Sequence, residues 1–273
     1  MISAPEPQIP ENPKPESPSS EHVFVVLAFG QSPFLSDCLR SLVDQTVKSR
    51  IIVATSTPSA FIDEAAHEAG VEVRVNPERL GIGGDWNFAL AVAGGRYITL
   101  AHQDDTYAPD FLARTLETFS HGEGVLCFTG YQEIDDQGAP KSSRISRVKH
   151  LLELIFLGGS QRVGGLRLRA FLSFGNPLPC PSVTYDLTRL AGFRFATDMK
   201  SNLDWEAWWR LMSSGNHFVR VRERVVRRRH NALTETSRLL KDGSRAAEDL
   251  IMFRRAWPRP ISDWIAGLYR LAG

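Results

Sequence analysis

The sequence of 273 residues contains little cysteine and lacks both a long apolar run and a signal-peptide pattern. Its three cysteines, Cys38, Cys127 and Cys180, are scattered without a CxxC spacing, which excludes a disulfide framework and favours a reducing compartment. The best apolar run, Leu151–Leu157, is interrupted by Glu153 and is far shorter than the roughly 20 residues that cross a bilayer. We therefore expect a cytoplasmic protein, either free or attached at the inner face of the membrane.

Net charge is also nearly absent, because 32 Lys and Arg balance 31 Asp and Glu to give +1. The two halves differ, however: residues 1–140 hold 8 basic and 20 acidic residues, whereas residues 141–273 hold 24 and 11. A basic half is typical of a surface that faces phosphates or an anionic membrane. The alternative is that the halves neutralise each other within one globule, and the sequence leaves both interpretations open.

Residues 1–21 are rich in Pro, Glu and Ser and have almost nothing to bury, so we expect a disordered tail. After this tail, apolar runs alternate with amphipathic segments of about ten residues. The run Val23–Phe29 is typical of a parallel strand covered on both faces. Ser32 followed by Pro33 predicts the N-cap and first turn of a helix that continues to about Val47.

The same alternation continues to about residue 130 and predicts an α/β fold, with a mostly parallel central sheet flanked by helices. Further strands are expected at 51–55, 71–75, 96–101 and 125–129, and helices at 58–69, 83–93 and 109–120. Beyond residue 138 the pattern predicts helices at 145–172, 203–212, 244–256 and 261–271, and strands at 182–185 and 217–226. Ligands of such sheets bind beyond the carboxyl ends of the strands.

Two adjacent acids follow the strand at 96–101, in the segment His102-Gln103-Asp104-Asp105. Neighbouring carboxylates repel each other unless a positive charge lies nearby, and a divalent cation such as Mg²⁺ or Mn²⁺ that carries substrate phosphates meets this requirement. His102 and Asp104 project to the same side of an extended segment, so a turn after Asp104 could bring all three side chains around one ion. The alternative is that the acids only cap the following helix.

A glycine-rich segment lies upstream of these acids. Gly81, Gly83 and Gly84 precede a helix and allow the backbone to approach a phosphate or a ribose closely. The segment is neither the dinucleotide-binding fingerprint, which follows a first strand, nor a P-loop, because no Gly-Lys-Ser/Thr follows it. Alone it is weak evidence for nucleotide binding.

Taken together, these segments resemble the family 2 glycosyltransferases, which have the GT-A fold. The resemblance covers residues 23 to about 237 and rests on the first strand and helix, GIGGDWN at 81–87, AxxxAxGxYI at 89–98, HQDD at 102–105, GNPLPCPSV at 175–183 and DWEAWWRL at 204–211. It implies a GT-A domain over residues 22–240, with a nucleotide-sugar half at 22–130 and an acceptor half at 131–240. Residues 241–273 would form a helical extension at a membrane surface or an interface.

The resemblance implies an inverting transfer of a hexose from a nucleotide-diphosphate sugar, with a divalent cation (Mn or Mg) at Asp104 and Asp105. His102 stands where the family usually has its first Asp, and a His in the place of His230 approaches the metal or the diphosphate in some relatives. The second strand ends without the acids that usually read the base or ribose, so UDP, dTDP and GDP all remain open. The nucleotide-sugar site is expected to include Ala28, Phe29, Thr55, Trp86, Asn87, Asp104 and Arg229.

On the acceptor side, the resemblance places Asp204 as the general base and Trp205, Glu206 and Asn176 as acceptor contacts. A carboxylate within hydrogen-bond reach of the acceptor hydroxyl can accept its proton. Asp204 would also serve as the N-cap of its own helix. The basic run at 227–231 would also serve as a solvated or lipid-facing surface, and these alternatives stay open.

The sequence thus predicts an inverting glycosyltransferase that acts on a saccharide or lipid-linked saccharide in cell-surface polysaccharide or glycolipid synthesis. The alternative is a catalytically degenerate GT-A-like domain that only binds nucleotide or carbohydrate, because His102 and the second strand depart from the family pattern. A sugar-phosphate nucleotidyltransferase is disfavoured because no Gly-rich, Lys-containing loop follows the first strand. Nucleic-acid binding is disfavoured because the basic residues lack interleaved aromatics.

Overall fold

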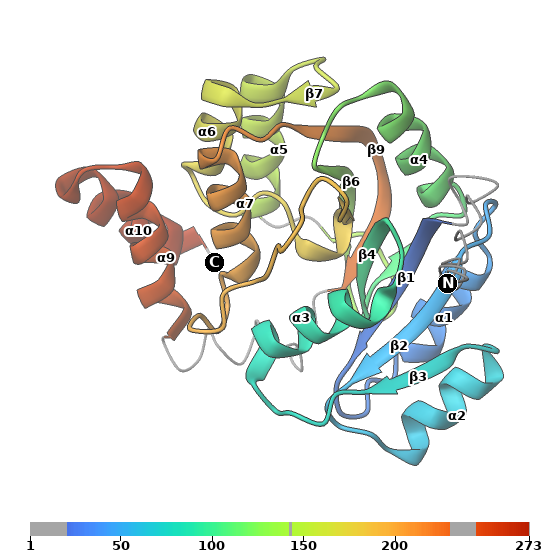
Figure 1. Cartoon of the computed structure of the whole chain (residues 1–273). Helices are drawn as coiled ribbons and strands as arrows, with labels where there is room; N and C mark the ends of the chain where they lie inside the picture. The colour runs from blue at the N-terminus through green and yellow to red at the C-terminus, as the bar shows by residue number, and fades with distance from the viewer. Residues whose placement is uncertain (1–20, 142–143, 230–243, 273) are drawn as a thin grey trace, which may run out of the picture.

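The computed structural model describes residues 21–141, 144–229 and 244–272. In these residues a nine-stranded sheet has the order β3-β2-β1-β4-β8-β6-β9-β5, with β7 paired to β9. Helices lie on both faces of the sheet (Figure 1). This architecture confirms the predicted α/β class. The predicted disordered tail lies outside the described residues except for Glu21.

The first half of the sheet is parallel, as the βαβ pattern predicted. Strands β3, β2, β1 and β4 are neighbours in that order and all pair in parallel. The bounds of this half are β1 His22–Ala28, α1 Leu35–Val43, β2 Arg50–Thr55, α2 Ala60–Glu68, β3 Glu72–Val75, α3 Gly81–Ala93, β4 Tyr97–His102 and α4 Phe111–His121. The carboxyl ends of β1, β2 and β4 therefore meet at one edge of the sheet, where the sequence places its nucleotide-sugar residues.

The apolar run of β1 is explained by a hydrophobic core on each face of the sheet. Phe24 and Val26 are buried in one core with Leu39 of α1. Val25 is buried in the other core with Leu90 of α3. Because side chains alternate between the faces of a strand, a strand covered on both faces is apolar at every position.

Helix α1 begins later than predicted. Its N-cap position is Phe34, and no side chain caps it, so Ser32 is not the N-cap. The hydroxyl of Ser32 instead donates a hydrogen bond to the carboxylate of Asp104. This contact ties the loop after β1 to the acidic end of β4.

The second half of the sheet contains both parallel and antiparallel strand pairs, whereas the sequence pattern predicts mostly parallel ones. Strand β8 is antiparallel to both β4 and β6, whereas β9 is parallel to β6, with shifts of register beside Gly130. The two-residue strands β5 and β7 pair antiparallel with β9 and are too short to produce a hydrophobic period. The bounds are β5 Thr106–Tyr107, β6 Leu126–Ile134, β7 Arg162–Val163, β8 Val183–Asp186 and β9 Phe218–Arg229.

The predicted helical region 145–172 forms two helices, which are separated by a glycine turn and β7. Gly158 begins this turn with a φ of +52°, a left-handed conformation that favours glycine. The remaining bounds are α5 Arg144–Leu157, α6 Gly165–Leu172, the short 3₁₀ helix η2 Cys180–Ser182, α7 Leu203–Ser213, α9 Ser244–Ala256 and α10 Arg259–Ala272.

The helices α9 and α10 pack against each other and lie beside α7 (Figure 1). The ring of Phe253 lies 5.1 Å from that of Trp205 of α7, and the indole N–H of Trp257 donates to the carbonyl of Ser173 over 2.8 Å. Phe253 is buried in the hydrophobic core that also contains Val25 of β1 and Leu90 of α3. The C-terminal helices therefore share a core with the sheet.

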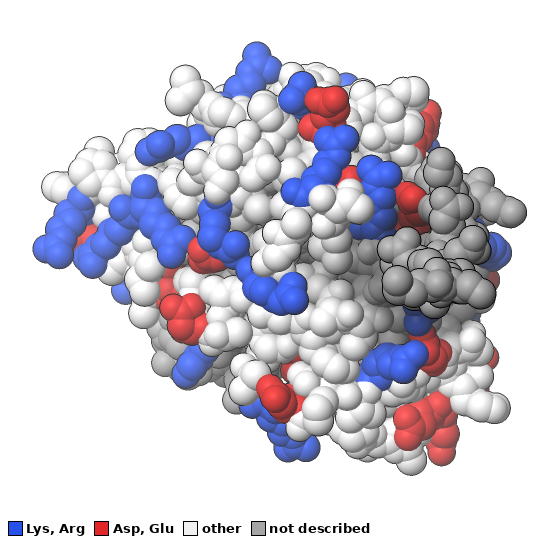
Figure 2. Space-filling view, in the orientation of Figure 1, with Lys and Arg blue, Asp and Glu red and all other residues white. Residues whose placement is uncertain are grey.

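None of the helices in the described part of the chain is both long enough and apolar enough to cross a membrane. Figure 2 shows Lys and Arg side chains gathered over the region of α9 and α10, where few Asp and Glu are visible. The basic character of the second half is therefore displayed on the surface and is not wholly neutralised by the first half.

Candidate active site

The two acids after β4 point to different partners. The backbone N–H of Asp105 donates to the carbonyl of His102 over 3.1 Å, which forms a turn. From this turn Asp104 reaches back to the hydroxyl of Ser32. The Oδ1 atom of Asp105 accepts a hydrogen bond of 2.8 Å from the backbone N–H of Arg229, at the end of β9.

Both acids are held where their charged forms are costly. Burial raises the pKa of Asp105 to about 7, against the lowering effect of the Arg228 charge and the Arg229 N–H. Burial also raises the pKa of Asp104, against the hydrogen bond from Ser32. A cation beside these carboxylates would favour their ionised forms.

His102 offers a nitrogen that has no protein partner among the described residues. Its Nε2 atom is buried and makes no hydrogen bond there. Burial, and to a smaller extent the charge of Arg228, lower the pKa of His102 to about 3, so the ring is neutral near pH 7. A neutral imidazole nitrogen without a partner is suited to ligate a metal.

The acids and His102 do not surround one point, which corrects the expectation of a three-residue cluster. Within the described ranges, no group of three or more His, Cys, Asp or Glu side chains is arranged to hold a metal ion. The reason is that Ser32 and Arg229 draw the two carboxylates toward different elements. The residues still fit an ion such as Mg²⁺, which proteins often bind through one or two carboxylates and the substrate's phosphates. His230 lies outside the described residues.

The loop after β1 presents an exposed ring beside the acids. The side chain of Gln103 accepts a hydrogen bond from the Phe29 N–H over 3.1 Å and donates one to the Phe29 carbonyl over 2.9 Å. Ala28 is buried, whereas Phe29 is 58% exposed. The Phe29 ring is therefore available to stack on a ligand, whereas Ala28 is not.

The end of β2 carries hydroxyls and acquires a carboxylate from another element. Thr55 is buried, and its hydroxyl accepts a hydrogen bond from the N–H of Thr57. Asp85 of α3 accepts hydrogen bonds of 2.9 Å from the hydroxyl of Ser56 and from the amide of Asn76. Sequence reasoning missed Asp85, although its place after two glycines was a signal. It supplies an acid beside β2, where the strand itself has none.

Trp86 and Asn87, expected in the nucleotide site, both make contacts within the protein from α3. The side-chain amide of Asn87 donates to the carbonyl of Phe195 over 3.0 Å and accepts from its N–H over 2.7 Å. Trp86 is buried, with its ring 4.9 Å from Phe195 and 5.6 Å from His102. Asn87 therefore fixes the segment around Phe195, and Trp86 supports the His102 ring.

Arg229 also differs from its expected role. Its guanidinium donates to the carbonyls of Asp104, Asp135 and Asp136. It also lies 4.1 Å from the ring centre of Phe34. These contacts leave its charge committed to the fold, because backbone carbonyls and an aromatic face occupy it. Arg229 joins β9 to the acidic turn.

The neighbouring arginine, Arg228, takes the central position that sequence reasoning gave to Arg229. Consecutive residues of a strand point to opposite faces. Burial is the main influence on His102, Asp105 and Asp204, and the charge of Arg228 lowers the pKa of all three. The alternation of a strand was the signal that could have separated the two arginines.

Asp204 is a buried carboxylate in the first turn of α7. The N-cap position belongs to Asn202, so Asp204 does not cap its own helix. Burial raises the pKa of Asp204, against hydrogen bonds from the Asn176 side chain and from the Trp205 N–H. Asn176 thus contacts the proposed base.

The acidic turn and Asp204 belong to one region of the molecule. Burial raises the pKa of the Cys180 thiol, and the charges of both Asp204 and Asp105 raise it further. Arg228 also acts on both carboxylates. Two residues from opposite halves of the chain therefore lie within electrostatic range of the same thiol and the same guanidinium.

Trp205 and Glu206 are placed in the interior, which corrects the expected acceptor contacts. Trp205 is 0% exposed, and its indole N–H donates to the carbonyl of Leu172 over 2.9 Å. Glu206 forms ion pairs of 3.2 Å with both Arg210 and Arg255. Trp205 is a core residue, and Glu206 joins α7 to α9.

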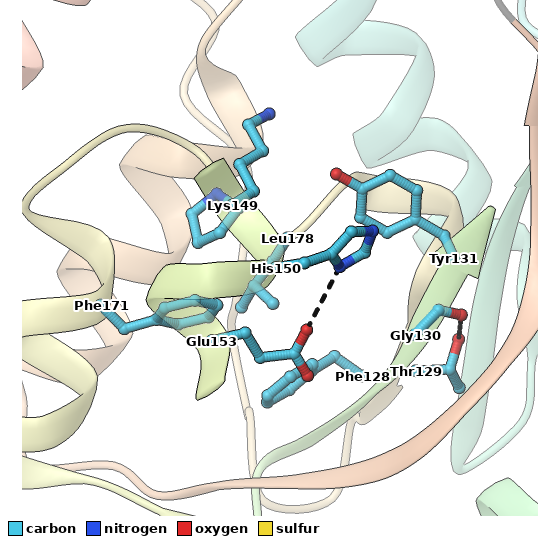
Figure 3. Close-up of a pocket in the computed structure, with 10 residues that line it drawn as sticks. Phe128, Thr129, Gly130, Tyr131, Lys149, His150, Glu153, Phe171 and Leu178 are labelled. Atoms are coloured by element: carbon cyan, nitrogen blue, oxygen red, sulfur yellow. Dashed lines mark hydrogen bonds and ion pairs between the residues drawn. The ribbon is translucent and has the colours of Figure 1, made fainter. Parts of the chain in front are cut away.

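A small cavity lies next to the Asn176 loop (Figure 3). Lys149 and His150 of α5 line it together with Tyr131 of β6 and Pro177. Neither Lys149 nor Tyr131 belongs to a motif in the sequence, so no pattern predicted them here. They bring an amine and a hydroxyl to this cavity.

Comparison with known proteins supports the family resemblance. The sequence matches the model of the family described as Glycosyl transferase family 2 over residues 23–178. A comparison with curated proteins finds no match.

Solved structures with the same fold cover most of this chain. A mannosyltransferase from Pyrobaculum calidifontis, in complex with GDP-Man and Mn²⁺, has a TM-score of 0.62 at 15% identity over 93% of this chain and 71% of its own. S. aureus TarS 1–349 with UDP-GlcNAc has a TM-score of 0.61 at 13% identity over 90% and 70%. Glucosyl-3-phosphoglycerate synthase from Mycobacterium tuberculosis, with Mn²⁺, UDP and glucosyl-3-phosphoglycerate, has a TM-score of 0.56 at 17% identity over 88% and 81%. At these identities the likeness concerns the fold.

Proposed function

Because this chain belongs to glycosyl transferase family 2, we propose that it transfers a hexose from a nucleotide-diphosphate sugar to a hydroxyl of a saccharide acceptor, with inversion at the anomeric carbon. The observation that supports this most is the convergence of Asp105 and Asp204, from opposite halves of the chain, on Arg228 and Cys180. One carboxylate serves the donor and the other serves the acceptor.

Asp204 is the general base of the proposed reaction. Its carboxylate accepts the proton of the acceptor hydroxyl as the oxygen attacks the anomeric carbon, on the face opposite the leaving diphosphate. Asn176 hydrogen-bonds to this carboxylate and orients it. The raised pKa of Asp204 supports this role, since a base with a pKa nearer to neutrality accepts a proton more readily, and such catalysis contributes about 10²–10⁴-fold.

Because Asp104, Asp105 and His102 do not surround one point, only some of them would hold a divalent cation, together with the diphosphate of the donor. When bound, such an ion neutralises charge that develops on the leaving diphosphate. The unpartnered nitrogen of His102 supports this assignment, as does the Mn²⁺ bound in two of the structural neighbours. In this proposal Phe29 would stack on the base, and Asp85 would accept hydrogen bonds from the ribose.

The acceptor side is proposed to work at a membrane surface, on a polysaccharide or glycolipid in synthesis. Val148, Leu151, Leu154 and Ile155 of α5 are all more than half exposed. On α10, Ile261, Trp264 and Leu268 are exposed as well. Apolar helix faces flanked by Arg fit an anionic bilayer, which attracts the charge and takes up the apolar side chains.

A screen of nucleotide sugars tests the proposed reaction. UDP-, dTDP- and GDP-sugars are added to the full chain with and without Mn²⁺, and the melting temperature and the release of nucleoside diphosphate are measured. We expect one class of donor to raise the melting temperature by a few degrees with Mn²⁺ and to release its diphosphate slowly. A donor that binds but is never turned over with any acceptor would favour a binding domain, and no stabilisation by any donor would contradict the proposal.

A further inference from the structure

Three cations from three different elements lie near the acceptor side of Asp204. Burial raises the pKa of Asp204, and the charges of Arg245 of α9 and Arg228 of β9 lower it. The pKa of Lys149 of α5 is lowered to about 7, mainly by burial and also by the charges of the same two arginines. The three cations are therefore close enough to influence one another or the same carboxylate.

The acids that face Lys149 do not neutralise it through direct contact. Glu133 of β6, Asp204 of α7 and Asp249 of α9 all act on it electrostatically. None of the described residues forms a hydrogen bond or an ion pair with the Lys149 ammonium. Asp249 is instead bound to the side chain of Asn202 over 2.8 Å. A lysine held among buried groups without a contacting acid is costly unless a ligand supplies the negative charge.

Tyr131 adds a second unused group to the same space. Its hydroxyl is buried and makes no hydrogen bond within the part of the chain that the structure describes, and the residue is only 4% exposed. Tyr131 and Lys149 line one cavity with Pro177, the residue after Asn176, and with Glu153, whose carboxylate is paired with Arg220 over 2.9 Å. Figure 3 shows the hydroxyl at the edge of the ring turned toward the Lys149 side of the cavity. A buried hydroxyl without a partner is expensive, and an acceptor oxygen would satisfy it.

We propose that Lys149 and Tyr131 bind a phosphate ester carried by the acceptor, beside the base Asp204. This inference rests on the proposed function, because it assigns a substrate class to the acceptor side of the same site. The Lys149 ammonium supplies a point charge and the Tyr131 hydroxyl donates to a phosphoryl oxygen, while Arg228 and Arg245 strengthen the local positive potential. The acceptor is thus a phosphorylated saccharide or polyol rather than a neutral one.

Binding of sulfate tests this site without requiring any donor or turnover. Sulfate has the tetrahedral oxygens of a phosphate ester and does not titrate near neutrality, so calorimetry of the full chain at about pH 6 and pH 8.5 reports on the protein alone. Because the pKa of Lys149 is about 7, we expect weaker binding at the higher pH. Lys149→Met should weaken sulfate binding about tenfold at the lower pH and remove this pH dependence, and Tyr131→Phe should weaken binding about threefold.

Arg147→Met is the matched control, since Arg147 is exposed on the same helix, and it should leave sulfate affinity unchanged. Sulfate that binds Lys149→Met as tightly as the wild type would overturn the proposal, because the ion would then lie elsewhere. If Lys149→Met fails to fold, unchanged binding in Tyr131→Phe overturns it instead. Sulfate binding at this site without turnover of any donor would contradict the proposed reaction but not the anion site. Turnover of a donor without sulfate binding at Lys149 and Tyr131 would contradict the anion site but not the proposed reaction.

Discussion

Arg228 and Arg229 are adjacent in β9, yet the structure uses them for different purposes. The guanidinium of Arg229 contacts three carbonyls and the face of Phe34, so it holds the acidic turn in place. Arg228 instead influences the pKa of His102, Asp105 and Asp204. One arginine thus holds the acidic turn, and the other acts on groups from both halves of the chain.

His22 gives the fold a dependence on pH that is separate from the site. It is the first residue of β1, is 0% exposed and hydrogen-bonds to Ser49 and Thr99. Burial lowers the pKa of His22 from 6.5 to about 3. Between these values the unfolded chain takes up a proton that the folded chain does not, so the free energy of unfolding falls as the pH falls.

We expect this residue to contribute a loss of about 1.4 kcal/mol per pH unit below pH 6.5. Urea unfolding of the wild type and of His22→Gln, at pH 7 and pH 5, measures it: the glutamine variant should lose less stability over this interval. His67→Gln, on the exposed face of α2, is the control. Equal pH dependence in the wild type and His22→Gln would show that His22 takes up its proton without unfolding.

At the level of single residues, the sequence predicted which acids follow β4 but not what holds them. The adjacent carboxylates and Asp204 were identified because the motifs that contain them are contiguous in the chain. Their partners come from distant segments: Ser32 for Asp104, and Arg229 for Asp105. Asn87 and Trp205 were predicted to bind ligands because they match positions of a motif. A motif does not say whether a side chain faces a cleft or the core, which depends on packing.

Helix α10 presents an apolar face on which a membrane contact can be tested. Ile261, Trp264 and Leu268 are 42%, 66% and 47% exposed, and their spacing of three and four residues places them on one side of the helix. Arg259 and Arg270 are exposed on the same helix. Such a face binds a bilayer through buried apolar area and attraction to anionic lipid.

The full chain should therefore sediment with vesicles of phosphatidylglycerol and phosphatidylcholine more than with phosphatidylcholine alone. Replacing Trp264 and Leu268 together by Ser should lower the partition coefficient at least about tenfold, because burial of each apolar side chain contributes roughly 1.5–3 kcal/mol. Leu80→Ser, at an exposed position just before α3, is the control. Unchanged vesicle binding by the double variant would show that the membrane contact lies elsewhere. Equal binding to the neutral and the anionic vesicles would contradict attraction to anionic lipid.

Among the elements, those with a strong hydrophobic pattern were predictable and those defined by pairing were not. The run at 23–29 identified β1, and the periodic segments identified α2, α3, α4 and α7 to within about two residues. The strands β5 and β7 have two residues each, too few for any period. The antiparallel insertion of β8 between β4 and β6 also has no local signal, because pairing depends on residues far apart in the chain.

For the whole molecule, the acidic first half and the basic second half meet at the site. Asp104 and Asp105 belong to the first half, whereas Arg228, Lys149 and Asp204 belong to the second. The mixed sheet makes this possible, because β9 pairs with β5 directly after the acidic turn and is parallel to β6. The end of β9 thus brings basic residues of the second half beside the acidic turn of the first half.

The rate of sugar transfer by Asp204→Asn, measured with Mn²⁺ and a saturating concentration of the nucleotide-sugar donor, tests the central claim most directly. Asparagine keeps the size of the side chain and one acceptor oxygen but cannot accept the proton. We expect transfer to fall by about 10²–10⁴-fold while the affinity for nucleoside diphosphate stays within about twofold of the wild type; Asp105→Asn should instead weaken that affinity. Transfer by Asp204→Asn within tenfold of the wild-type rate would contradict the account, because the proton would then leave through another group.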